Sequence, residues 1–103
     1  MLVGFFSGDD IMILYCRLEL RLPMAVSLKD KRRLLNSLQD KLNNKFNIAI
    51  AEIEDNDFWK KSVLGLVSIS NKNVQLEKLL NKIINFVDQF EGVILVDYSV
   101  DYY

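Results

Sequence analysis

The sequence predicts a single α+β domain whose elements follow the order β-α-β-β-α-β. Three observations support this prediction. The chain has 103 residues, which suits one small domain. Half of the residues are apolar and about a quarter are charged, as in ordinary globular proteins. The spacing of the apolar residues switches repeatedly between the strand period of two and the helix period of about 3.6, and these switches divide the chain into six elements.

The first strand is expected from Met12 to Leu22, because leucines alternate there with mostly polar residues. Pro23 ends this strand, since proline offers no backbone donor to a sheet. Ser27 is then expected to cap a helix over residues 28–44. Asp30 lies three residues after Ser27 and completes a variant of the capping box.

In the middle of the chain, the residue pattern predicts a hairpin and then a second helix. A short strand is expected over residues 47–54, followed by a turn rich in Asp and Asn. Residues 62–70 are apolar on both faces, which is typical of a central strand. The second helix, capped by Asn71 or Asn73, carries its apolar residues on one arc.

Gly92 is expected to form the left-handed C-terminal cap of that helix, and residues 93–103 form the last strand. Right-handed crossovers turn this order into the split βαβ, or ferredoxin-like, arrangement. It has a four-stranded antiparallel sheet in the order 4-1-3-2, with two helices on one face and the other face uncovered. Residues 12–103 make this domain. Residues 1–11 are expected to be a dispensable N-terminal extension, either an added arm or a stretch before a true start at Met12.

The types of residue present exclude several kinds of site. The chain has one cysteine, Cys16, and no histidine, so it cannot form an intramolecular disulfide, a His-based triad or a four-cysteine zinc site. It has no Gly-rich phosphate loop and no nucleophile elbow. We therefore expect no catalytic residue, no metal site and no cofactor. Without a signal peptide or an apolar run of about 20 residues, the chain is expected to be cytoplasmic and not in a membrane.

The strongest functional indication is a group of basic residues at the start of the first helix: Lys29, Lys31, Arg32 and Arg33. Residues 27–45 carry a net charge of +4, whereas the rest of the chain carries −5. Positive charge there opposes the helix dipole, so the group would suit a bound anion such as RNA phosphate. Ser27 and nearby backbone N–H groups would add hydrogen bonds. The alternative is a solvated basic patch balanced by acidic residues elsewhere.

Lys31 differs from its basic neighbours, because at 100° per residue it points along the apolar face of the helix. A lysine there must extend past the helix end or find a carboxylate, for which Glu52, Glu54 and Asp57 are candidates. The acidic turn that holds them could also bind a hard cation, but it lacks the EF-hand spacing. Trp59 follows this turn and is expected either to anchor the hairpin or to face a partner.

The uncovered face of the sheet is expected to combine apolar residues with charges of both signs. We assign to it Tyr15, Leu64 and Leu66 together with Arg17, Glu19 and Arg21. Such a surface suits a self-complementary homodimer. The interface candidates are Tyr15, Arg17, Arg21 and Trp59, and the alternative is a solvated face. Stacking of RNA bases on the sheet is poorly supported, since the third strand has no aromatic residue.

Several segments resemble the YlxP-like family of small bacterial proteins of unknown function. They are LELRLP at residues 18–23, SLKDKRR at 27–33, FNIAIAE at 46–52, DFW at 57–59 and LG at 64–65. The resemblance covers nearly all of residues 12–102. It implies a ferredoxin-like fold and no particular activity. Members of this family often lie in gene clusters with translation and ribosome-maturation factors, which implies a link to translation by association.

We therefore expect a non-enzymatic module that binds RNA or a ribosomal particle through the basic start of the first helix and forms a homodimer. Two alternatives remain open at this point. One is a binder of a small phosphate-containing ligand at the same helix start. The other is a structural dimer without a ligand. An isoelectric point near 5.3 opposes strong non-specific binding of nucleic acid.

Overall fold

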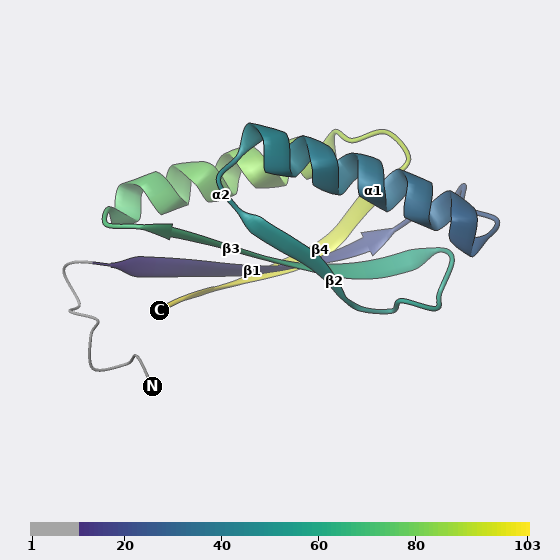
Figure 1. Cartoon of the computed structure of the whole chain (residues 1–103), viewed down its shortest axis with the longest axis horizontal. Coiled ribbons are helices and arrows are strands. Elements are labelled where there is room, and N and C mark those ends of the chain that lie inside the picture. The colour runs from purple at the N-terminus through teal and green to yellow at the C-terminus, as the bar shows by residue number, and fades with distance from the viewer. Residues whose placement is uncertain (1–10) are drawn as a thin grey trace.

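The computed structural model describes residues 11–103, and it has the six predicted elements in the predicted order (Figure 1). They are β1 (Met12–Arg21), α1 (Leu28–Lys45), β2 (Ala49–Glu54), β3 (Lys61–Ser70), α2 (Asn73–Asp88) and β4 (Ile94–Tyr102). The strands pair in the order β2-β3-β1-β4, and every pairing is antiparallel. Both helices lie on one face of the sheet (Figure 1). The predicted ferredoxin-like α+β fold is thus confirmed. The expectation that residues 1–11 are dispensable stays a prediction, because residues 1–10 lie outside the described part of the chain.

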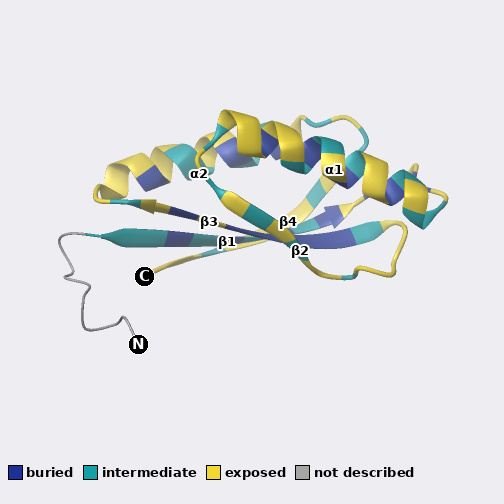
Figure 2. Ribbon diagram, in the orientation of Figure 1, coloured by how far each residue is buried: buried dark blue, intermediate teal, exposed yellow. Residues whose placement is uncertain are grey.

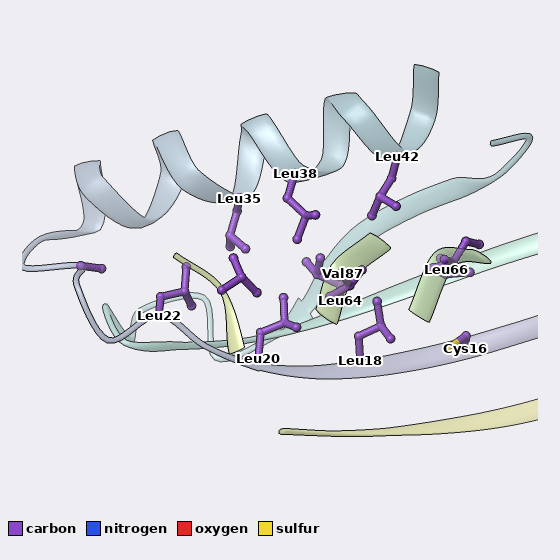
Figure 3. Packing of buried hydrophobic residues seen from close by; sticks show 13 residues of the cluster. Cys16, Leu18, Leu20, Leu22, Leu35, Leu38, Leu42, Leu64, Leu66 and Val87 are labelled. Atoms are coloured by element: carbon purple, nitrogen blue, oxygen red, sulfur yellow. The ribbon is translucent and has the colours of Figure 1, made fainter. Parts of the chain in front are cut away.

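The core lies between the helices and the sheet. Every second residue of β1 from Leu14 to Leu20 is fully buried, as the alternating pattern predicted. Of these side chains, Cys16, Leu18 and Leu20 belong to one core cluster with the buried leucines of α1, which recur at helical spacing, and Figure 3 shows the two sets pointing toward one another. Figure 2 shows the same division on the helices, whose buried residues face the sheet while exposed residues cover the outer side. Neither helix within residues 11–103 is long and apolar enough to cross a membrane.

The prediction that Leu64 and Leu66 lie on the uncovered face was wrong. In the antiparallel pair of β1 and β3, Leu64 is opposite Leu18 and Leu66 is opposite Cys16. Opposite residues of such a pair point to the same side of the sheet, so both leucines join the core. Their exposures are 0% and 1%. A strand that is apolar on both faces carries no alternation, and the sequence alone could not assign its register.

The two ends of α2 also differ from the prediction. Lys72, not Asn71 or Asn73, is the N-cap residue, and its side chain makes no capping hydrogen bond. The helix ends at Asp88, four residues before Gly92. Gly92 does have the expected positive φ of 89°, but it lies in the turn closed by the hydrogen bond from the Val93 N–H to the Phe90 carbonyl. This glycine therefore serves the turn into β4 and does not cap the helix.

The uncovered face holds an ion-pair cluster at its centre. Arg17 donates to Glu19 at 2.7 Å and to Glu54 of β2 at 2.8 Å, although β3 lies between β1 and β2. The residue of β3 opposite Arg17 is Gly65, and the side chains of Ile53 and Tyr15 approach it where a side chain would stand. A Cβ on Gly65 would approach Ile53 to 3.1 Å. These hydrogen bonds, first that to Glu54 and then that to Glu19, raise the pKa of Arg17 above its already high ordinary value.

Candidate functional site

Three segments meet at one end of the fold, on the right in Figure 1: the β1–α1 loop (residues 22–27), the first two turns of α1 and the β2–β3 loop (residues 55–60). We call this region the loop end. The two loops are tied together through Lys60. Its backbone carbonyl accepts from the Leu22 N–H at 2.8 Å, and its ammonium donates to the Pro23 carbonyl at 2.7 Å.

Ser27 caps α1 as predicted. Its hydroxyl oxygen accepts from the Asp30 N–H at 3.1 Å, and the Asp30 carboxylate accepts from the Val26 N–H at 3.1 Å. This arrangement stabilises the helix start with a carboxylate of the protein itself, near the positive end of the helix dipole. A bound anion would therefore meet the basic side chains of the first two turns more readily than the backbone N–H groups.

Lys31 lies apart from the other basic residues of the candidate site. Its side chain is 2% exposed, and its ammonium lies 2.8 Å from a carboxylate oxygen of Glu52, one of its predicted partners. The same oxygen accepts from the Ser62 hydroxyl at 2.6 Å. Lys31 also donates to the backbone carbonyls of Asp55 and Asn56. This lysine therefore joins α1 to the β2–β3 loop and orients the helix start.

Lys29, Arg32 and Arg33 are exposed on the first two turns of α1. The ion pairs found among residues 11–103 involve only Arg17 and Lys31 as cations. The positive charge of the three exposed residues is thus not neutralised by direct contact with a described carboxylate. Such a group raises the local concentration of anions and of polyanionic ligands.

Trp59 is 50% exposed and the neighbouring Phe58 is 54% exposed, so both residues of the β2–β3 loop are about half covered by the protein and half open to solvent. They line an open pocket of about 420 Å³, which we call the Trp59 pocket. Its lining residues are Arg21, Asp57, Phe58, Trp59, Lys60 and Lys61. Phe58, Lys60 and Lys61 were not predicted as site residues, although Phe58 and Lys60 adjoin the only tryptophan of the chain.

Two cations of this pocket are neighbours on the adjacent strands β1 and β3. Arg21 at the end of β1 is directly opposite Lys61 at the start of β3. Like charges in this arrangement destabilise a sheet. The ammonium of Lys61 lies over the Phe58 ring, 4.3 Å from its centroid. Contact with the ring's negative face offsets part of the repulsion and holds Lys61 at the pocket.

Two carboxylates of the acidic segment, Glu52 and Glu54, and the thiol of Cys16 have structural roles. Glu52 and Glu54 each pair with a cation on the same chain, Lys31 and Arg17 respectively. Cys16 is fully buried among core residues, and burial raises the pKa of its thiol to about 11. A thiol with that pKa is almost wholly protonated near neutral pH and makes a poor nucleophile.

The sequence comparisons agree with the resemblance. Residues 13–100 match the family described as "Protein of unknown function (DUF503)". The chain is also 38% identical to the "Uncharacterized protein YlxP" of Bacillus subtilis (strain 168). That alignment spans 69 residues, which are 67% of this chain and 75% of the relative.

The structural comparisons concern the fold alone. The de novo designed protein Foldit4 superposes with a TM-score of 0.54 at 10% identity, over 91% of this chain and 97% of the design. A designed protein described as having a ferredoxin fold, LFR1 1, gives a TM-score of 0.47 at 7% identity, over 88% of this chain and 82% of the design. At such low identity, likeness in fold carries no information on function.

Proposed function

This chain belongs to the DUF503 family of proteins of unknown function, and we propose that it is a binding module that recognises RNA phosphates with its loop end. The observation that carries the proposal is the exposed group of Lys29, Arg32 and Arg33. No described carboxylate lies within ion-pair distance of it. Side chains of this kind are the usual contacts of proteins with a nucleic-acid backbone.

The charge distribution also supports a localised site. The whole chain has a formal net charge of −1, so its general electrostatic attraction to nucleic acid is weak. Positive charge is instead concentrated at the start of α1 and beside the Trp59 pocket, within one end of the fold. Lys31 is buried in its ion pair with Glu52, and its role in this proposal is to position α1.

Replacing Lys29, Arg32 and Arg33 together by Gln is expected to weaken the binding of a labelled single-stranded RNA. Each lost phosphate contact lowers the magnitude of the log–log salt slope by about 0.7, so three lost contacts lower it by about 2. Stability should stay the same or rise slightly, because Lys29 no longer opposes the helix dipole. Fluorescence polarisation over a salt series and thermal unfolding measure the two effects.

A control variant with the same change in charge is available on the other helix. Lys72, Lys78 and Lys82 are exposed at the N-cap and along α2, and their replacement by Gln should leave the salt slope unchanged. Equal losses in both triple variants would show that only net charge matters and would contradict the proposal. Equal binding of free inorganic phosphate and of RNA phosphates would favour the small-ligand alternative.

The uncovered sheet face supports a second function, association of two copies of the chain. Beside the Arg17 cluster this face exposes Val67 by 39%, Ile69 by 55% and Ile53 by 43%. Apolar side chains that adjoin one another on a surface mark contact sites. Tyr15 and Arg17 lie on this face, and Arg21 lies at its edge beside the Trp59 pocket.

The double variant Val67→Lys with Ile69→Lys is expected to shift the protein toward the monomer in sedimentation velocity experiments, because two charges then enter the apolar part of this interface. It leaves the ion pairs of Arg17 intact, which a change of Arg17 itself would not. Val74→Lys with Met24→Lys provides the control, since these apolar residues are 59% and 80% exposed outside the sheet. A wild-type protein that sediments as a monomer at high concentration rules out this second function.

A further inference from the structure

The Trp59 pocket has features that phosphate binding alone does not require. A site for phosphate groups needs cations, yet this pocket pairs its cations with two aromatic rings that are each about half exposed. Neither ring belongs to the hydrophobic core cluster of the described residues. Burying the apolar surface of Trp and Phe is favourable, so a ligand that covers these two exposed rings would gain binding free energy.

We infer that the Trp59 pocket takes a nucleotide of single-stranded RNA, with the base stacked on Trp59 or Phe58 and the adjoining phosphate between Arg21 and Lys61. The inference rests on the proposed function and names its substrate class. Bases of a duplex are stacked on one another and cannot reach such rings, whereas those of a single strand can. Proteins that bind single strands combine aromatic platforms with cationic grooves in this way.

Arg21 and Lys61 provide the place where the phosphate of the nucleotide would bind. Arg21 and Lys61 are directly opposite each other, and neither forms an ion pair with a described carboxylate. A phosphate between them would replace their repulsion with two attractions. Lys60 is occupied by the Pro23 carbonyl and holds the loop in place. Asp57 is the acidic member of the lining, and its negative charge weakens the attraction of the pocket for any anion, so stacking on the aromatic rings must supply part of the affinity.

The pocket can be observed directly, because Trp59 is the only tryptophan of the chain. An oligouridylate is expected to quench its fluorescence in a saturable manner, since base stacking brings the uracil ring onto the indole. An abasic ribose-phosphate chain of the same length should bind more weakly and quench little. Uridine monophosphate should quench only at much higher concentration, because it lacks contacts to neighbouring phosphates.

Trp59→Ala is expected to weaken the binding of labelled oligouridylate by about 5- to 150-fold, the range for loss of one stacking contact. Trp59→Phe should retain most of the affinity, since it keeps an aromatic face. Met24→Ala removes another exposed side chain of the loop end and serves as the control. Circular dichroism should be the same for all three variants, because both side chains are exposed.

The possible failures separate this inference from the proposed function. If Trp59→Ala binds as tightly as the wild type while the Lys29, Arg32 and Arg33 variant does not, the pocket is not a base site but the phosphate site stands. Equal quenching by the abasic chain, or by polyglutamate, overturns the inference in favour of simple charge or an acidic peptide. If the wild type binds no oligouridylate at low salt, both proposals are wrong.

Discussion

Replacing Glu52 by Gln is expected to lower the free energy of unfolding by about 3 kcal/mol, because it leaves the buried ammonium of Lys31 without a counter-charge. The Lys31 side chain is 2% exposed and that of Glu52 is 15% exposed, so water screens this pair poorly. The glutamine oxygen and the carbonyls of Asp55 and Asn56 can still accept hydrogen bonds from Lys31. We therefore place the loss at the lower end of the range for broken buried pairs. Urea denaturation measures it.

Glu54→Gln is a matched control on the same strand. Glu54 pairs with Arg17, but its side chain is 55% exposed, and exposed pairs contribute about 1 kcal/mol or less. Adding Lys31→Met to Glu52→Gln should recover most of the lost stability, since no charge then remains buried there. A double-mutant cycle that also includes Lys31→Met alone isolates the interaction. Equal effects of Glu52→Gln and Glu54→Gln would show that burial of Lys31 does not control stability.

Leu64→Ala is expected to cost about 2–5 kcal/mol, the range for truncating a fully buried leucine. Leu64 is 0% exposed and belongs to the core cluster (Figure 3). Ile69→Ala, on the same strand but on the uncovered face, should cost less than about 1 kcal/mol because Ile69 is 55% exposed. Both are measured by urea denaturation at low protein concentration, where self-association contributes least. Similar losses for the two variants would contradict the assignment of these residues to opposite faces.

Alternation and helical spacing were sufficient to predict the fold. β1 alternates so regularly that the sequence predicted which of its residues face the core. Ser27 together with Asp30 indicated the start of α1. β3 gave no such information, because a strand apolar on both faces fits either register. The faces of Leu64 and Leu66 became clear only once their pairing with β1 was known.

The candidate site was predicted in parts. Helical geometry placed Lys31 toward the sheet, but the choice of Glu52 over Glu54 and Asp57 depended on a contact between segments distant in sequence. The solvent exposure of Trp59 was not predictable for the same reason. Whether a loop tryptophan is buried depends on where its loop lies relative to the sheet. The pairing of Arg21 with Lys61 likewise requires the register of β1 and β3.

The attachment of the β2–β3 loop affects how fast and at what entropic cost a ligand can bind. Lys31 holds the carbonyls of Asp55 and Asn56 at one end of the loop, and Lys60 is bonded to Leu22 and Pro23 at the other. Asp55 itself has a left-handed backbone with φ of 63°, which these contacts help to maintain. The backbone of this loop and the start of α1 thus keep their relative positions before any encounter. Association at the loop end should need no ordering of this loop, so its rate would be governed by diffusion and electrostatic attraction, and the backbone of the protein would lose little conformational entropy.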